Sequence, residues 1–235
     1  MDPGTELELA DWRRRVAELY ADVRAMTAES PEIAWKHWVE TRERLFRTHP
    51  QSPVPEADRP GFRAHHWPYD ADLRFELRLE TDRPPAAEGL AASGLAASGL
   101  AASSGPATGS AAPLAIALPN SGADALSFHR IGAVAIPFKD GERRLSVFWM
   151  EGYAGGLFLA FRDATNGTQT YGAGRYLIDA AKSADLGGDP VEGTVILDFN
   201  FAFQPSCAFD PRWACPLAPP ENRLDLPIRA GERIA

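Results

Sequence analysis

Cysteine, lysine and long apolar runs are all scarce in this sequence. Of its 235 residues only two are cysteine and three are lysine, so arginine supplies almost all of the positive charge. Acidic residues outnumber basic ones by 32 to 24, and no basic cluster is longer than Arg13 to Arg15. Proteins that follow a phosphate backbone need a continuous basic stripe, so this composition argues against nucleic acid as a partner.

Segments that direct a protein into or across a membrane are also missing from the sequence. The opening residues MDPGTELELA have neither the positive n-region nor the apolar h-region of a secretory signal. No run of about 18 apolar residues occurs, as a membrane span would require. We therefore expect a cytoplasmic protein with no membrane partner. In a reducing compartment two cysteines are more often free thiols than a disulfide.

Two helices are predicted at the beginning of the chain. Apolar residues recur every three or four positions across residues 7–26, which gives one apolar face on a helix. Ser30, Pro31 and Glu32 then supply a capping hydroxyl, a first-turn proline and an acidic first turn, so a second helix is expected to begin there. His49-Pro50 ends that helix. The interval 1–49 is accordingly assigned to N-terminal helices.

The next segments change from extended chain to strand. Prolines are frequent between Pro50 and Pro68, which favours an extended wrapping segment over a regular ladder. From Leu73 to Glu80 leucine and phenylalanine alternate with arginine and glutamate, the pattern of a half-buried strand. Residues 84–113 repeat Gly-Leu-Ala-Ala-Ser and then lose all large side chains. We interpret them as a flexible low-complexity insertion, because they offer too little apolar area to offset ordering.

Short strands separated by turn residues follow the insertion. Asp140-Gly141 is a two-residue hairpin signal between two apolar runs. No strand–helix alternation and no Gly-rich dinucleotide motif is present, which argues against a doubly wound fold. The predicted fold class is α+β, mainly antiparallel β, with the N-terminal helix pair followed by a β-barrel or β-sandwich. Residues 50–235 would form this antiparallel β domain, in one structural unit with the helices.

Polar side chains gather on the predicted strands of the C-terminal half. In a strand over 194–204, Asp198 and Asn200 would share the face opposite a row of apolar residues. In a strand beginning at Tyr171, that residue and Arg175 would flank a small alanine. If both polar faces line one barrel mouth, these four residues converge and the arginine can grip a carboxylate or phosphate.

This constellation has a purely structural alternative, as does a nearby turn. Arg175 could instead pair with Asp198 or Glu232 and tie the strands together, as half-buried ion pairs commonly do. In Asp163 to Gly167 the Asp and Thr side chains are expected to cap their own loop around a tight Asn-Gly turn. A metal or catalytic role for that turn is the less favoured interpretation.

The two cysteines, Cys207 and Cys215, lie in one turn-rich segment. Cys207 as a nucleophile would need a base, and His129 is the only histidine of the strand-rich region. A zinc site would need two further ligands from scattered histidines, so no metal and no cofactor is predicted. Packing as small apolar side chains in rigid proline turns is the favoured interpretation.

Several motifs of the C-terminal half occur in an order typical of one family. They are Phe-x-Asp-x-Thr-x-Gly at 161–167, Thr-Tyr-Gly-x-Gly-Arg-Tyr-Leu at 170–177, Asp-Phe-Asn at 198–200, Pro-x-Cys at 205–207, Cys-Pro-Leu at 215–217 and Glu-Asn-Arg-Leu at 221–224. With these motifs the chain resembles an uncharacterised prokaryotic family, domain of unknown function 1684. The resemblance implies boundaries and candidate positions but no chemistry. Where that family usually has Tyr-Asn-Pro-Pro-Cys this chain has Phe203 to Cys207, which weakens any role for that tyrosine hydroxyl.

Three classes of function are consistent with these observations. The best supported is a small-molecule binding protein whose anionic ligand contacts Tyr171, Arg175, Asp198 and Asn200. The second is a cysteine-dependent hydrolase or transferase that uses Cys207. The third is a structural or interaction module with no ligand.

Overall fold

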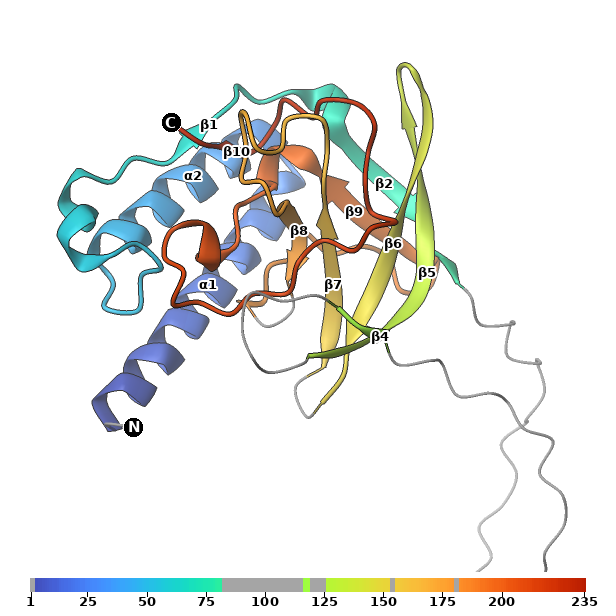
Figure 1. Cartoon of the computed structure of the whole chain (residues 1–235). Coiled ribbons are helices and arrows are strands. Elements are labelled where there is room, and N and C mark those ends of the chain that lie inside the picture. The colour runs from blue at the N-terminus through green and yellow to red at the C-terminus, as the bar shows by residue number, and fades with distance from the viewer. Residues whose placement is uncertain (1–2, 82–115, 119–125, 153–154, 180–181) are drawn as a thin grey trace, which may run out of the picture.

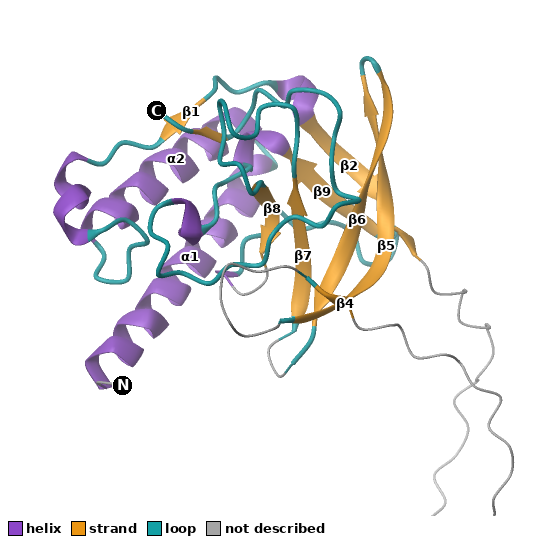
Figure 2. Ribbon diagram, in the orientation of Figure 1, coloured by secondary structure: helices purple, strands orange, loops and turns teal. Residues whose placement is uncertain are grey.

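The computed structural model describes residues 3–81, 116–118, 126–152, 155–179 and 182–235 (Figure 1). The low-complexity insertion expected at 84–113 lies outside the described residues. Among the described residues the model places two helices side by side, with the strands gathered next to them (Figures 1 and 2). The connections between these elements include several short 3-10 turns.

The helices are α1 (Pro3–Thr27) and α2 (Pro31–Thr48). The predicted start of α2 is confirmed, because the Ser30 hydroxyl accepts a hydrogen bond from the backbone N–H of Ile33 at 3.4 Å. The two helices pack as a hairpin: the rings of Trp12 and Phe46 are 5.9 Å apart. At the end of α2, His49 Nε2 lies 3.2 Å from a carboxylate oxygen of Asp11 on α1.

The strands pair antiparallel throughout, in three sheets. The largest sheet has the order β3-β5-β6-β7-β8 with β4 added to β5, and β2 pairs with β9 and β1 with β10. These pairings leave the large sheet open among the described residues, so α+β with mainly antiparallel sheets is confirmed and a closed barrel is not found. The strands are β1 (His65–His66), β2 (Arg74–Arg78), β3 (Glu80–Thr81), β4 (Ile116–Ala117), β5 (Ser127–Phe138), β6 (Gly141–Met150), β7 (Gly156–Phe161), β8 (Arg175–Asp179), β9 (Thr194–Asp198) and β10 (Glu232–Arg233).

The hairpin expected at Asp140-Gly141 joins β5 to β6. Phe138 is registered opposite Gly141, so the two strands reverse across Lys139 and Asp140. Gly141 has a φ of +124°, which glycine adopts without the steric cost that a side chain would bring. This local signal was therefore sufficient to place the turn.

The strand expected over 194–204 is shorter than predicted. It ends at Asp198, whose Oδ1 accepts the backbone N–H of Asn200 at 2.9 Å and starts a 3-10 turn over Phe199–Phe201. The alternation of faces therefore stops at Asp198. Phe199 packs with the strand residues Leu197 and Val195, whereas Phe201 joins a different apolar cluster next to the helices.

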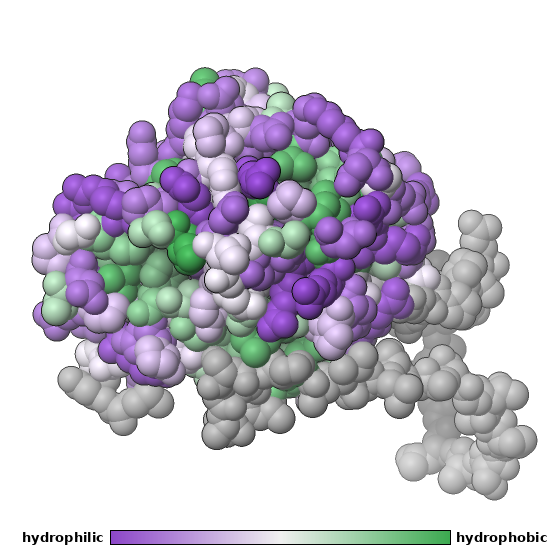
Figure 3. All heavy atoms as spheres, turned by 45° about the horizontal axis from the view of Figure 1, so that its top comes forward, coloured by the Kyte–Doolittle hydropathy of each residue, from purple (hydrophilic) through white to green (hydrophobic). Residues whose placement is uncertain are grey.

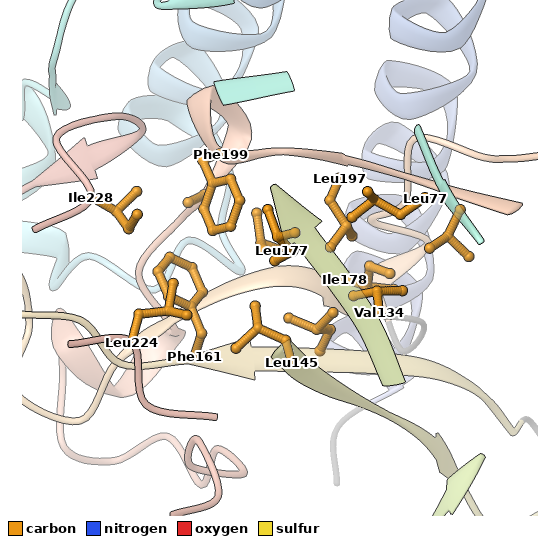
Figure 4. Packing of buried hydrophobic residues seen from close by; sticks show 14 of the residues in the cluster. Leu77, Val134, Leu145, Phe161, Leu177, Ile178, Leu197, Phe199, Leu224 and Ile228 are labelled. Atoms are coloured by element: carbon orange, nitrogen blue, oxygen red, sulfur yellow. The ribbon is translucent and has the colours of Figure 1, made fainter. Parts of the chain in front are cut away.

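Two apolar clusters form most of the core. The first lies between β2 and β9 and the large sheet; Figure 4 shows Leu145, Phe161 and Phe199 among its members. The second joins the helices to the sheet, because Trp38 of α2 packs in the same cluster as Phe128 and Phe158. A smaller cluster around Trp12 closes the helix hairpin.

Candidate functional site

Arg175 lies at the start of β8 with no exposed surface. Its Nη2 donates to Asp163 Oδ2 at 2.6 Å and to the carbonyl oxygen of Ile228 at 2.9 Å. Its Nη1 donates to the carbonyl oxygens of Ala230 and Glu232. The guanidinium thus holds the C-terminal segment to the Asp163 turn. An ion pair of Arg175 is thus present, but the expected partner was wrong. Arg175 pairs with Asp163 and not with Asp198 or the carboxylate of Glu232.

The turn over Asp163–Gly167 caps itself, as expected from its residues. Asp163 Oδ1 accepts the backbone N–H of Thr165 at 2.6 Å and also its hydroxyl. Asn166 Oδ1 accepts the N–H of Asp163 at 2.6 Å, and its amide nitrogen donates to the carbonyl of Tyr171 at 2.8 Å. Asp163 is thus fully engaged by Thr165 and Arg175. This arrangement is that of a structural turn.

Tyr171 lies before β8 rather than in it, because the chain turns through Gly174 at a φ of +106° before the strand begins at Arg175. Its hydroxyl makes a side-chain hydrogen bond with Cys207. Burial, and after it this hydrogen bond, raises the pKa of Tyr171 to about 12. Tyr171 therefore interacts with Cys207 in the following turn-rich segment.

Cys207 and Cys215 are both buried, are not joined by a disulfide, and contact each other through their thiols. The backbone N–H of Cys207 donates to the Sγ of Cys215 at 3.3 Å. The hydrogen bond to Cys207, and after it burial, raises the pKa of the Cys215 thiol. His129, the base considered for a nucleophilic cysteine, has its Nδ1 3.2 Å from a carboxylate oxygen of Glu151. His129 therefore already has a carboxylate neighbour of its own.

Asp198 and Asn200 do come together, at the end of β9. The Asn200 amide nitrogen donates to Asp198 Oδ1 at 2.7 Å and to the carbonyl oxygen of Asp70 at 2.8 Å. Its Oδ1 accepts the backbone N–H of Asp70 at 2.8 Å. Asn200 thereby fixes the segment that leads into β2. On the other side of the carboxylate, the hydroxyl of Tyr69 lies 3.4 Å from Asp198 Oδ2.

Asp198 has the electrostatics of a carboxyl group held away from water. It is 1% exposed, and burial raises its pKa to about 6 against the opposing hydrogen bonds from Asn200 and the charge of Arg74. Burial also raises the pKa of Tyr69, with the charge of Asp198 adding to the effect. The Tyr69–Asp198 pair therefore contains a carboxyl group that titrates close to neutral pH.

An open groove lies beside this pair. Its volume is about 610 Å³, and it runs between the first turn of α2 and the first residues of β2. Arg74 enters this groove from β2, where it is registered opposite Asp198. Within the described part of the chain, Arg74 makes no hydrogen bond and no ion pair through its guanidinium. The groove is lined by Ser30, Pro31, Glu32, Tyr69, Ala71, Arg74, Phe75 and Glu76.

Tyr69 and Arg74 were not among the residues expected at a site. Arg74 was placed on the charged face of the predicted strand, but nothing local indicates that this strand pairs with the one carrying Asp198. Tyr69 follows the proline-rich segment, where the sequence has no periodicity to place it. The pairing of β2 with β9 supplies the missing information, since it brings Arg74 opposite Asp198 across 124 positions of sequence.

A second buried polar cluster surrounds Glu232. Its Oε1 lies 2.7 Å from Nε of Arg42 on α2, and its Oε2 accepts the backbone N–H of Gln204 at 2.7 Å. Burial acts to raise the pKa of Glu232, but the charge and hydrogen bond of Arg42 outweigh it and lower the pKa. The Arg42 guanidinium also stacks over the rings of Trp38 and Phe46. This cluster joins α2 to β10.

Neither a metal centre nor a membrane segment is found in the described part of the chain. No group of three or more His, Cys, Asp or Glu side chains there could hold a metal ion. None of the described helices combines the length and the apolar character that crossing a membrane requires. On the face drawn in Figure 3, hydrophilic residues cover much of the surface, with smaller hydrophobic areas between them.

Comparison with known proteins gives a solved relative and a family. The chain is similar to the solution NMR structure of an uncharacterised protein from Haloarcula marismortui, with 26% identity and a TM-score of 0.56 over 88% of this chain and 96% of the other. Comparison with the curated proteins gives no match. Residues 102–233 match the family described as a protein of unknown function (DUF1684). This match spans more than half of the sequence, and the chain belongs to that family.

Proposed function

We propose that the protein binds a small molecule with an anionic group in the groove between α2 and β2. The observation that carries the proposal is Arg74, a residue that lines the groove and whose guanidinium has no ion pair or hydrogen bond among the described residues. A guanidinium presents several donors in a rigid fork that matches a carboxylate or a phosphate. Tyr69, whose hydroxyl lies 3.4 Å from Asp198 Oδ2, lines the same groove.

The acidic residues of the groove do not cancel this preference. Glu32 forms an ion pair with Lys36 at 2.7 Å, and Glu76 accepts the hydroxyl of Thr194 at 2.9 Å. Both carboxylates therefore have partners at hydrogen-bonding distance, whereas Arg74 has none there and interacts with Asp198 only through its charge. The first turn of α2 also directs its positive dipole end toward the groove, which favours a negative group there.

Asp198 and Asn200 do not line the groove but contact residues next to it. Asn200 fixes Asp70, and Asp198 holds the hydroxyl of Tyr69, so the two residues position Tyr69 next to the ligand. A carboxyl group with a pKa of about 6 can also give or take a proton near neutral pH through that hydroxyl. In this proposal Arg175 and Tyr171, two of the four residues expected to contact the ligand, instead hold neighbouring segments in place. A closed barrel is not required.

A titration tests the proposal directly. Uniformly labelled protein would be titrated with inorganic phosphate and with a series of small mono- and dicarboxylates, while backbone amide shifts are followed by NMR. We expect saturable shifts confined to the start of α2 and to Ala71 through Glu76. Replacing Arg74 by Ala should lower the affinity for the anion that binds by about tenfold to a hundredfold, which is the contribution of a charge-assisted hydrogen bond.

Arg78→Ala provides the matched control. Arg78 lies on the same strand with a 71% exposed side chain, pairs with Glu192 at 3.5 Å, and is absent from the groove. Its replacement should leave ligand affinity unchanged. Equal affinities for the wild type and Arg74→Ala, or shifts outside the groove, would contradict the proposal. No saturable shift with any of these anions would instead favour a module without a ligand.

A further inference from the structure

Cys207 and Cys215 form a thiol pair that the proposed groove does not use. Cys207 belongs to a short 3-10 turn (Ser206–Ala208), and Cys215 follows in an irregular segment. Their side chains are hydrogen bonded, and the backbone N–H of Cys207 also donates to the Sγ of Cys215 at 3.3 Å. Neither cysteine belongs to a strand that would fix its backbone rigidly. Because the two side chains are already in contact, disulfide formation requires the sulfurs to move from this contact to a bonding distance of about 2.0 Å.

A cavity lies beside one of the two cysteines. It has a volume of about 240 Å³, and Cys215 lines it together with the neighbouring Ala214 and Pro216. Most of the other wall residues are apolar, such as Met150 and Phe158. Since a water molecule occupies about 30 Å³, a molecule slightly larger than water can enter this space. A bulky reagent such as a peptide disulfide cannot be accommodated as easily.

We propose that Cys207 and Cys215 are a redox-active dithiol, which hydrogen peroxide entering through this cavity converts into an intramolecular disulfide. Three observations carry the proposal: the side-chain contact between the two thiols, their irregular backbone, and the access of a small oxidant to Cys215. Tyr171 completes the cluster, because its hydroxyl is hydrogen bonded to Cys207. The hydrogen bond to Cys207, and after it burial, raises the pKa of the Cys215 thiol and keeps it protonated, so its oxidation should be slow and should require an excess of peroxide.

The reaction balances in two steps. The Cys215 thiol releases its proton, and its sulfur attacks one oxygen of the peroxide, so that an S–O bond forms and the O–O bond breaks. The departing hydroxide takes up the proton and becomes water. Cys207 then attacks the sulfur of the resulting sulfenic acid; the S–S bond forms, the S–O bond breaks, and the second hydroxide leaves as water with the proton of Cys207. Two thiols and one peroxide thus give one disulfide and two water molecules.

Peptide mapping of the wild-type chain tests this reaction. The folded full-length protein would be treated with hydrogen peroxide, quenched with catalase, unfolded, alkylated and digested with trypsin. Trypsin cleaves after Arg212, which lies between the cysteines, so a disulfide joins two separate peptides. We expect this linked pair to be the main product, with both cysteines protected from alkylation until a reductant is added. Two alkylated cysteines after treatment, disulfide-linked dimers, or unlinked sulfinic acids would each overturn the proposal.

Two serine variants separate the roles of the sulfurs. Cys207→Ser removes the second thiol, so oxidation of Cys215 should stop at a sulfenic acid that dimedone traps. Cys215→Ser removes the sulfur that lines the cavity, and oxidation of Cys207 should then be at least about tenfold slower, because access controls thiol oxidation. Equal rates in Cys215→Ser and the wild type would refute entry through the cavity. If a variant does not fold, the mapping of the wild-type chain still decides whether the disulfide forms.

Discussion

Arg175 Nη2 lies 2.6 Å from Asp163 Oδ2, and neither side chain has any exposed surface. A buried charge of this kind is tolerated only while its partner and hydrogen bonds remain. Here the guanidinium also satisfies carbonyl oxygens at Ile228 and Glu232, so one side chain connects β8, the Asp163 turn and the C-terminal segment. This arginine is consequently a structural centre of the fold.

Replacing Arg175 by Met should lower the free energy of unfolding by about 3–5 kcal/mol, because Asp163 is left buried without its partner. Urea denaturation at neutral pH measures the loss. The double variant Arg175→Met, Asp163→Asn serves as the control, since it removes the stranded charge as well and should recover part of the stability. A loss below about 1 kcal/mol for the single variant would contradict the structural role.

Asp198 should make stability fall as pH rises. Its pKa is raised from 3.8 to about 6 in the folded protein, so the folded state keeps a proton that the unfolded state has released. The contribution is fully present below pH 3.8 and is lost as pH rises through about 6. The shift of about two pKa units corresponds to about 3 kcal/mol.

Asp198→Asn isolates that contribution from the other carboxylates. The difference in unfolding free energy between the variant and the wild type should grow in favour of the variant between pH 4 and about pH 7. Urea denaturation at a series of pH values gives this difference. Glu192→Gln, at a side chain that is 65% exposed, is the matched control. A difference for Asp198→Asn that stays constant with pH would be inconsistent with a raised pKa.

Asn222 is a fully buried amide that joins two neighbouring strands. Its Oδ1 accepts the N–H of Ser146 at 2.7 Å, and its amide nitrogen donates to the carbonyls of Ser146 and Ala160, both at 2.9 Å. Asn222→Ala leaves these backbone groups unpaired and should cost about 2–4 kcal/mol, measured by urea denaturation. The adjacent and exposed Glu221→Ala should change stability by no more than about 0.5 kcal/mol. Similar small losses for both variants would refute this account.

Gly231 precedes β10 in a conformation reserved for glycine. Its φ is +74°, and an added Cβ would lie 2.4 Å from the carbonyl oxygen of Ala202. Gly231→Ala should therefore lower the melting temperature strongly and displace Glu232 from Arg42. Gly61→Ala, where nothing lies within 4 Å of the added carbon, should be close to neutral. If the two variants melt at the same temperature, the close approach at Gly231 does not determine the stability of the fold.

Local patterns predicted the elements whose signals lie within a few residues. The cap at Ser30 placed the start of α2, and Asp140-Gly141 placed the β5–β6 hairpin, because both depend on neighbouring residues only. The strand at Asp198 was extended too far because its side chain competes for a backbone N–H. The apolar residues continue to alternate in the sequence through Phe203. The backbone, however, is no longer a strand once the 3-10 turn over Phe199–Phe201 begins.

The candidate site could be predicted only in part. Asp198 and Asn200 were identified and do lie together, since both come from one short segment. The partner of Arg175 and the neighbours Tyr69 and Arg74 depend on which distant segments pair, and periodicity carries no information on that choice. The placement of Tyr171 failed for a related reason: glycine-rich turns before β8 break the strand that the residue pattern suggested.

The pairing of β2 with β9 has a consequence for the interval that matches the family model. Residues 102–233 match the family, yet β9 completes its ladder with β2 at Arg74–Arg78, and the Glu232 carboxylate is neutralised by Arg42. A fragment confined to the matched interval would expose the edge of β9 and leave a buried anion uncompensated. The interval that matches the family model is thus smaller than the unit that must fold together, and α2 and β2 complete that unit.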